Sequence, residues 1–370
     1  MKKFLLIAIV LLLSLSFVAC SGTVQYVDMT PWKMGEYEKL TYRIYEEGVS
    51  GDDGSNTGVL VMEMEELNAD GKYVIPQINA TTKKLENKKV DLERGCYILK
   101  RSLSFPVDAS NGVYDMMENI TFADDNFKPL YSYATLIMAK EQVAYTGSGD
   151  EPDCVSYVTT TKYTFNADTS KWSATSSYLR QDRYGKPNVS EWTIFDTQQF
   201  KDLAENSTDM NMLYYHLRFI NNLTETNDFS YQCSNPMVLE SSIKSVNCTG
   251  AVEQFAIDDS VPYLYKEYKN AYGDNYGGFS LDLVKVNIFP MNQAVTGSGI
   301  AVYYSRSPIL AIEELGDATA DTLSAVSDQK GSARVPVMII ENARPTTTSS
   351  LYPDSRGTMT YRLENITNVK

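Results

Sequence analysis

The sequence predicts an all-β fold, mainly antiparallel, in which one large curved sheet or partly closed barrel packs against one helix. Apolar and polar residues alternate along most of the chain, as they do in strands with one buried and one solvated face. Clusters of Gly, Asp, Asn and Ser, such as residues 51–58, separate these segments and are typical of turns. The 26 tyrosines suit strands with one wet face. Curling lets many strands share one core and hides sheet edges.

The period-two pattern begins where Leu40, Tyr42 and Ile44 alternate with more polar neighbours. Residues 60–64 repeat it after the turn at residues 51–58. By the same criterion we expect further strands at residues 73–77, 95–104, 112–122, 128–138, 142–146, 154–166, 171–180, 190–195, 229–234, 238–243, 247–257, 279–289, 296–305, 334–342 and 356–366.

One segment, residues 208–221, has the period of a helix instead. Its apolar residues recur at spacings of three and four, and Thr208 is a candidate N-cap. We expect Leu213, Tyr214 and Leu217 to be buried against the sheet, where the helix closes one end of a concavity.

No low-complexity linker divides the chain, so a single elaborated domain is expected over residues 35–370. Residues 1–19 and 20–34 precede it as a signal peptide and an anchor segment. A short helix is predicted at residues 197–205, and an insertion near residues 306–333, where the sequence is acidic and alanine-rich without a firm period.

The N-terminus has the organisation of an export signal. Lys2 and Lys3 precede an apolar run over residues 4–17, which is too short to span a membrane as a helix. The following residues 18–20, Val-Ala-Cys, resemble the lipobox of bacterial lipoproteins. That resemblance implies cleavage before Cys20, a diacylglyceryl group on its thiol and a lipid-anchored location in the cell envelope. Ordinary secretion with an incidental cysteine is the alternative.

The charge of the chain restricts its partners. Removal of residues 1–19, which include Lys2 and Lys3, leaves 31 basic and 47 acidic side chains, a net charge of −16. Such an acidic surface disfavours binding to nucleic acid and an electrostatic hold on anionic lipid. We therefore expect the membrane attachment to come from the acyl chains.

The remaining cysteines and the single histidine do not indicate a metal or another cofactor. Tetrahedral zinc sites need ligand pairs at short spacing, which this chain lacks. Cys233 and Cys248 are spaced to close a disulfide across a hairpin, although four cysteines allow three pairings. Buried free thiols are an equal expectation for Cys96 and Cys154.

Short motifs in a fixed order resemble the exported bacterial proteins grouped as DUF3108. Members have a "GE-x-L-x-Y" start, a short "LR" helix and a closing "R-x-P-V" segment. The matching segments here are residues 35–44, 127–130, 162–165, 195–196, 213–218, 301–305 and 334–337. Tyr303 stands where the family usually has Trp. The resemblance implies a β-rich envelope protein and supplies no catalytic residue.

Candidate catalytic residues have simpler structural interpretations. His216 is the only histidine available to a nucleophile, and it lies at the edge of an apolar helical stripe. Glu63, Glu65, Asp258 and Asp259 are the visible carboxylates for a glycoside hydrolase, but solvated strand faces and turns explain them as well.

Two loops are candidate binding sites. One loop offers oxygen ligands for calcium at Asp52, Asp53, Ser55 and Asn56, although it lacks the ligand order of an EF-hand loop. The glycine-rich residues 272–279 form either a plain surface loop or the aromatic rim of a pocket, at the open end of the concavity.

We therefore expect a non-enzymatic envelope lipoprotein without a cofactor. It would bind an apolar or amphipathic ligand in the concavity of the sheet, or an envelope protein partner. A carboxylate-dependent hydrolase of envelope polysaccharide and a purely structural surface protein are the alternatives. A concavity filled by the protein's own side chains would favour the protein partner.

Overall fold

The structure is a computed structural model. It describes residues 37–46, 58–108, 113–139, 154–166, 168–169, 171–183, 192–203, 207–219, 229–234, 244–256, 258–273, 280–290, 299–305, 335–342 and 358–369. Cys20 and residues 52–56, 274–279 and 306–334 lie outside this part of the chain, so the predictions made for them stay predictions.

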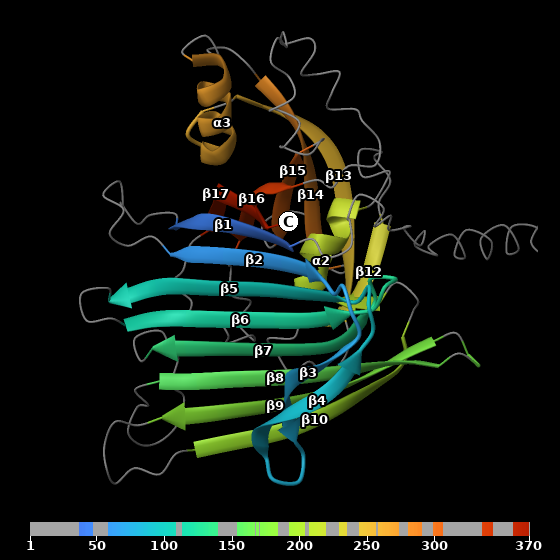
Figure 1. The fold of residues 1–370 in the computed structure, drawn as a ribbon. Helices are drawn as coiled ribbons and strands as arrows, with labels where there is room; N and C mark the ends of the chain where they lie inside the picture. Colours follow the sequence, from blue (N-terminus) through green and yellow to red (C-terminus); the bar gives the residue numbers. More distant parts are fainter. Residues whose placement is uncertain are drawn as a thin grey trace, which may run out of the picture.

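One large sheet of fifteen strands dominates the described residues, in the order β10-β9-β8-β7-β6-β5-β2-β1-β17-β16-β15-β14-β13-β12-β11 (Figure 1). Every neighbouring pair is antiparallel except β11 and β12, which are parallel. The strands are β1 (Tyr37–Glu46), β2 (Val59–Glu66), β5 (Tyr97–Asp108), β6 (Val113–Ala123), β7 (Pro129–Ala139), β8 (Cys154–Asn166), β9 (Lys171–Arg183), β10 (Trp192–Leu203), β11 (Ser207–Asp209), β12 (Phe229–Ser234), β13 (Lys244–Ala256), β14 (Ser280–Pro290), β15 (Ile300–Ser305), β16 (Pro336–Asn342) and β17 (Thr358–Val369).

The alternation in the sequence sets which side chains face inward. On β1, Leu40, Tyr42 and Ile44 are buried, and their neighbours are more exposed. Their partners on β2 include Met62, opposite Leu40, and Leu60, opposite Tyr42. Because side chains opposite each other in a ladder share a face, these residues form one continuous inner surface.

The half of the sheet from β5 through β1 to β11 curls around a short helical segment, α2 (Met210–His216) and η3 (Leu217–Phe219) (Figure 1). Every residue from 211 to 219 is buried. The main core cluster joins this segment to side chains of β1, β2, β14, β15, β16 and β17. The predicted burial of Leu213, Tyr214 and Leu217 against the sheet is therefore confirmed.

A separate hairpin of β3 (Gly71–Asn79) and β4 (Lys84–Leu92) lies against the opposite, outer face of the sheet. At its base, Ile75 and Leu92 pack with Ile98 and Phe122 of the sheet. Near its tip, Ile78 packs with Val158, and its backbone N–H donates to Thr160 Oγ1 at 3.2 Å. The hairpin thus crosses the sheet from β5 toward β9.

The structure differs from the sequence prediction in three places. Residues 197–205 were expected to include a short helix, but β10 runs through Trp192–Leu203, because its backbone pairs with β9. The hairpin strand β4 was not anticipated, since its mostly exposed residues do not alternate. A second helix, α3 (Pro262–Tyr272), starts at a proline and ends at Gly273, which has a positive φ of 61°.

Candidate functional site

Helix α2 brings most of the buried polar groups of the curled half into one region. The sequence predicts Thr208 as its N-cap, but the cap is the next residue, Asp209. The Asp209 carboxylate accepts a hydrogen bond from the backbone N–H of Met212 at 2.7 Å. An acceptor there satisfies a free N–H of the first turn and places a negative charge at the positive end of the helix dipole.

Asp209 also links the short end strand β11 to the middle of the sheet. Its Oδ2 accepts hydrogen bonds from Thr121 Oγ1 of β6, at 3.0 Å, and from Ser132 Oγ of β7. Burial raises the pKa of Asp209, and the hydrogen bonds from Ser132, Met212 and Thr121 oppose that shift. The Asp209 carboxylate therefore connects β11, at the end of the sheet, to β6 and β7. In the described structure β11 does not pair with either of these strands through its backbone.

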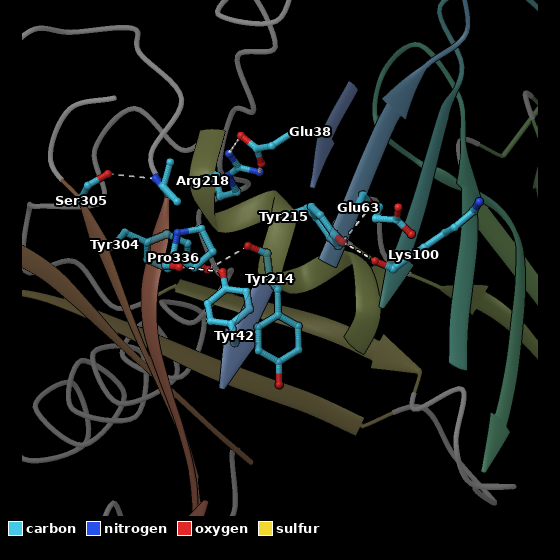
Figure 2. Close-up of polar contacts among 11 residues, drawn as sticks. Glu38, Tyr42, Glu63, Lys100, Tyr214, Tyr215, Arg218, Tyr304, Ser305 and Pro336 are labelled. Carbon is cyan, nitrogen blue, oxygen red and sulfur yellow. Dashed lines mark hydrogen bonds and ion pairs between the residues drawn. The ribbon is translucent and has the colours of Figure 1, made fainter. Parts of the chain in front are cut away.

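A buried ion pair lies at the other end of the helical segment. Arg218 donates from both terminal nitrogens to the carboxylate of Glu38 on β1, at 2.7 and 3.0 Å (Figure 2). The Arg218 side chain is 0% exposed and that of Glu38 is 10% exposed. Burial alone would lower the pKa of Arg218, but the Glu38 carboxylate outweighs it and the net pKa is raised, so the guanidinium stays charged.

Tyrosine hydroxyls connect the helix and the strands around it (Figure 2). Tyr42 donates to the carbonyl of Pro336 at 2.6 Å, and Tyr304 donates to the carbonyl of Tyr214 at 2.9 Å. Tyr215 donates to the carbonyl of Lys100 on β5 at 2.6 Å. Burial raises the pKa of Tyr42 and Tyr215 well above the ordinary value, so these hydroxyls remain donors.

One polar set on the inner side remains partly exposed. Glu341 of β16 accepts hydrogen bonds from the hydroxyls of Tyr214, at 2.9 Å, and Tyr361, at 2.8 Å. The guanidinium of Arg101 on β5 lies 4.7 Å from the centroid of the Tyr214 ring. Arg101 and Glu341 keep partial solvent access. A cation, an anion and two hydroxyls here are chemically suited to holding a polar group.

The structure places His216 in an apolar environment. Its ring meets Phe127 edge-on, with 5.5 Å between ring centroids, and the residue is 3% exposed. Burial, and to a lesser degree the charge of Lys128, lowers the pKa of His216 to about 3. Such a weak base does not activate a nucleophile near neutral pH, where a general base works best with a pKa close to the ambient value.

Of the candidate carboxylates, Glu63 adjoins this region, because its backbone carbonyl accepts a hydrogen bond from the Tyr215 hydroxyl at 3.0 Å (Figure 2). Glu63 and Glu65 alternate with the buried Met62 and Met64, so they occupy the outer face of β2, where Tyr37 donates to Glu63. Asp258 and Asp259 belong to the turn before α3; Asp258 accepts from the backbone N–H of Ser260 at 2.8 Å.

The register of β12 and β13 corrects the predicted disulfide. Cys248 lies opposite Phe229, whereas Cys233 lies opposite Lys244. An offset of four residues separates the cysteines by roughly 14 Å along the strands, and bonded cysteines need Cα atoms within about 7 Å. Cys248 is instead a buried free thiol, and burial raises its pKa. Cys96, also buried and free, agrees with one of the two alternatives left open for it.

Other parts of the site were not found from the sequence. Neither Glu38 nor Asp209 stands out in the sequence, because no pattern around it indicates a partner. Only the fold shows that Glu38 pairs with Arg218 and that Asp209 caps α2. Arg218 had a signal, since it belongs to the "LR" motif of the family resemblance. Within the described ranges, no three His, Cys, Asp or Glu residues gather as metal ligands, and no helix there is long and apolar enough to cross a membrane.

No family profile, curated protein or solved structure matches this chain. The resemblance to DUF3108 therefore depends on the ordered motifs alone.

Proposed function

We propose that this protein is a lipoprotein of the bacterial cell envelope, anchored through Cys20, that acts by binding another envelope protein at its surface. The observation that carries the proposal is the filling of the curl. The inner space is occupied by α2 and η3, all of whose residues from 211 to 219 are buried. A partner is then more readily accommodated outside the curl than within it.

The chemistry of the buried groups supports binding rather than catalysis. Arg218 is paired with Glu38, and Asp209 caps α2 while it holds Thr121 and Ser132. His216 is neutral in an apolar environment. These contacts stabilise one arrangement of helix and sheet, so the polar groups have structural partners within the protein.

The positions of the family motifs support the DUF3108 resemblance. Segments distant in sequence meet around α2: Tyr42 contacts Pro336, and Val335 donates to Ser305 Oγ at 3.0 Å (Figure 2). Phe127 packs on His216 and Phe219. Proteins that share a fold are expected to keep such motifs together, because the packing of each motif depends on the others.

The test of this proposal has two arms, both in the native host. Cys20→Ala should move the protein out of the membrane fraction or block its maturation, while Cys96→Ala should leave the fractionation unchanged. Wild-type protein with an unmodified Cys20 would refute the anchor. Crosslinking in intact cells should then yield a discrete adduct with another protein. Recovery of the monomer alone would refute the protein partner.

An amphipathic ligand is the second candidate, favoured by the partly exposed set of Arg101, Glu341, Tyr214 and Tyr361. Its polar end would meet the charged groups and its apolar part the neighbouring Leu103 and Met117. Native mass spectrometry of protein extracted from its own membrane distinguishes the two. A co-purified molecule that is lost in Arg101→Gln would favour the ligand over the protein partner.

A further inference from the structure

The hairpin of β3 and β4 is basic, although the chain as a whole is acidic. Residues 71–92 contain five lysines and two acids, a net charge of +3, against −14 for the entire chain. The rest of the chain therefore carries −17. The lysines of this hairpin are Lys72, Lys83, Lys84, Lys88 and Lys89.

The hairpin has one face on the sheet and one face in solvent. Ile75 and Leu92 face the sheet, where they are buried. On the opposite face, Val74 lies directly across from Lys89, and Val74 is 54% exposed. Leu85, near the tip of the hairpin and across from Ile78, is 40% exposed. Lys89 shares the outward face with Val74. Lys84 and Lys88 alternate with Lys89 along β4, and all three are exposed on this strand, which pairs only with β3 among the described residues.

The lysine charges are largely available to a partner. Lys72 approaches Asp91 at 4.0 Å, and both side chains are more than two-thirds exposed, so that pair is weak. Within the described residues, Lys84, Lys88 and Lys89 form no ion pair, and all three are exposed.

We infer that the exposed, lysine-rich strand β4 of the β3–β4 hairpin docks on the anionic phospholipid surface to which Cys20 is anchored. The inference rests on the lipid anchor of the proposed function. Lysines near an anionic bilayer are attracted to its phosphates, and adjacent aliphatic side chains partition into the headgroup region. The acidic remainder of the chain is repelled, which orients the hairpin toward the membrane.

The tether makes a weak surface contact effective. Only 16 residues lie between Cys20 and Tyr37, so the described fold begins within about 60 Å of the bilayer. The short tether gives the hairpin a high effective concentration at the lipid surface. A docked hairpin therefore fixes which face of the protein is turned toward the membrane and which face is left for a partner.

Edge protection is the other role that lysines have on an exposed strand such as β4. Charged side chains discourage pairing with a second copy of the chain. That role does not depend on the charge of the lipid, whereas docking does, so the two are separated by changing the lipid alone.

The experiment uses the lipidated protein in vesicles of neutral phosphatidylcholine or of phosphatidylcholine with 30% phosphatidylglycerol. Lysine acetylation is followed by mass spectrometry. We expect Lys84, Lys88 and Lys89 to react at least threefold more slowly on the anionic vesicles, with protection lost in 0.5 M salt. Lys162 and Lys201, exposed on the main sheet, serve as internal controls and should not change. Equal reactivity of the hairpin lysines on both vesicles would overturn the inference.

A second arm uses residues 21–370, which keep every described strand but lack the anchor. The amount of this protein that sediments with anionic vesicles should fall at least tenfold in the triple variant Lys84→Gln/Lys88→Gln/Lys89→Gln. It should fall less than twofold in the matched triple variant Lys162→Gln/Lys201→Gln/Lys266→Gln. Equal losses in both triples would refute the hairpin as the contact. Protection in native membranes but not in anionic vesicles would assign the surface to an acidic protein instead. A protein that carries no lipid on Cys20 refutes the proposed anchor, a result visible in its mass before either arm begins.

Discussion

Arg218 and Glu38 form a two-point hydrogen-bonded ion pair across 180 residues of sequence, inside the curl of the sheet. The pair joins the end of the helical segment to the first strand. Removing one partner from a buried pair leaves an uncompensated charge, which typically costs about 3–5 kcal/mol.

We therefore predict that Glu38→Ala lowers the free energy of unfolding by about 3–5 kcal/mol. The measurement is urea denaturation followed by circular dichroism. Arg43→Ala is the matched control, because its pair with Glu364 is 42% and 33% exposed and should contribute less than about 1 kcal/mol. The double variant Glu38→Ala/Arg218→Met should be less destabilised than Glu38→Ala. Equal losses in Glu38→Ala and Arg43→Ala would contradict the buried pair.

The carboxylate of Asp209 should make stability depend on pH. Because burial raises its pKa, the folded protein binds this proton more tightly than the unfolded chain does. Its contribution is fully present below the ordinary carboxyl pKa of about 4 and is lost as the pH rises through the raised folded value. Asp209→Asn removes this loss, so the variant should gain relative to wild type as the pH rises above about 4.

Asp258→Asn is the control for that series. The hydrogen bonds from Ser260 lower the pKa of Asp258, so its contribution is present above the ordinary carboxyl pKa and is lost as the pH falls. The relative stability of this variant should therefore shift in the opposite direction, and only slightly, because Asp258 is solvent-exposed. Unfolding curves at several pH values provide the test. A pH-independent difference between Asp209→Asn and wild type would show that Asp209 has an ordinary pKa.

Leu217 tests the packing of the helical segment. It is 0% exposed, and truncation to Ala should cost about 2–5 kcal/mol through lost burial and the cavity that remains. Leu85→Ala, at 40% exposure, removes the same atoms from the surface and should cost much less. The two variants are compared by their urea midpoints. Similar midpoints would place Leu217 outside the core.

The register of β12 and β13 predicts that Cys248 is never bonded to Cys233. Under denaturing conditions without reductant, iodoacetamide should label Cys248 fully, as shown by peptide mass spectrometry. In the folded protein the same thiol should react slowly, because it is 0% exposed and burial raises its pKa. Detection of a Cys233–Cys248 disulfide peptide would refute the register.

The sequence by itself determined most of the strands and, on β1 and β2, which face is buried. Alternation along β1 and β2 separates buried from exposed side chains, because successive residues of a strand point to opposite sides. The helical spacing of Leu213, Tyr214 and Leu217 likewise predicted one buried face. These patterns are local, and each segment carries its own signal. The strand β10 shows the limit, since pairing with β9 outweighed the local preference predicted for residues 197–205.

Only the tertiary structure decided which distant segments meet. The pairing of Arg218 with Glu38, the contact of Asp209 with β6 and β7, and the register that separates Cys233 from Cys248 join residues whose local sequence carries no information about their partners. The same holds for the hairpin of β3 and β4, because only the fold shows that these two strands pair with each other outside the main sheet. Such features depend on the order and curvature of the whole sheet, because long-range pairing, rather than any single segment, sets the distance between the groups.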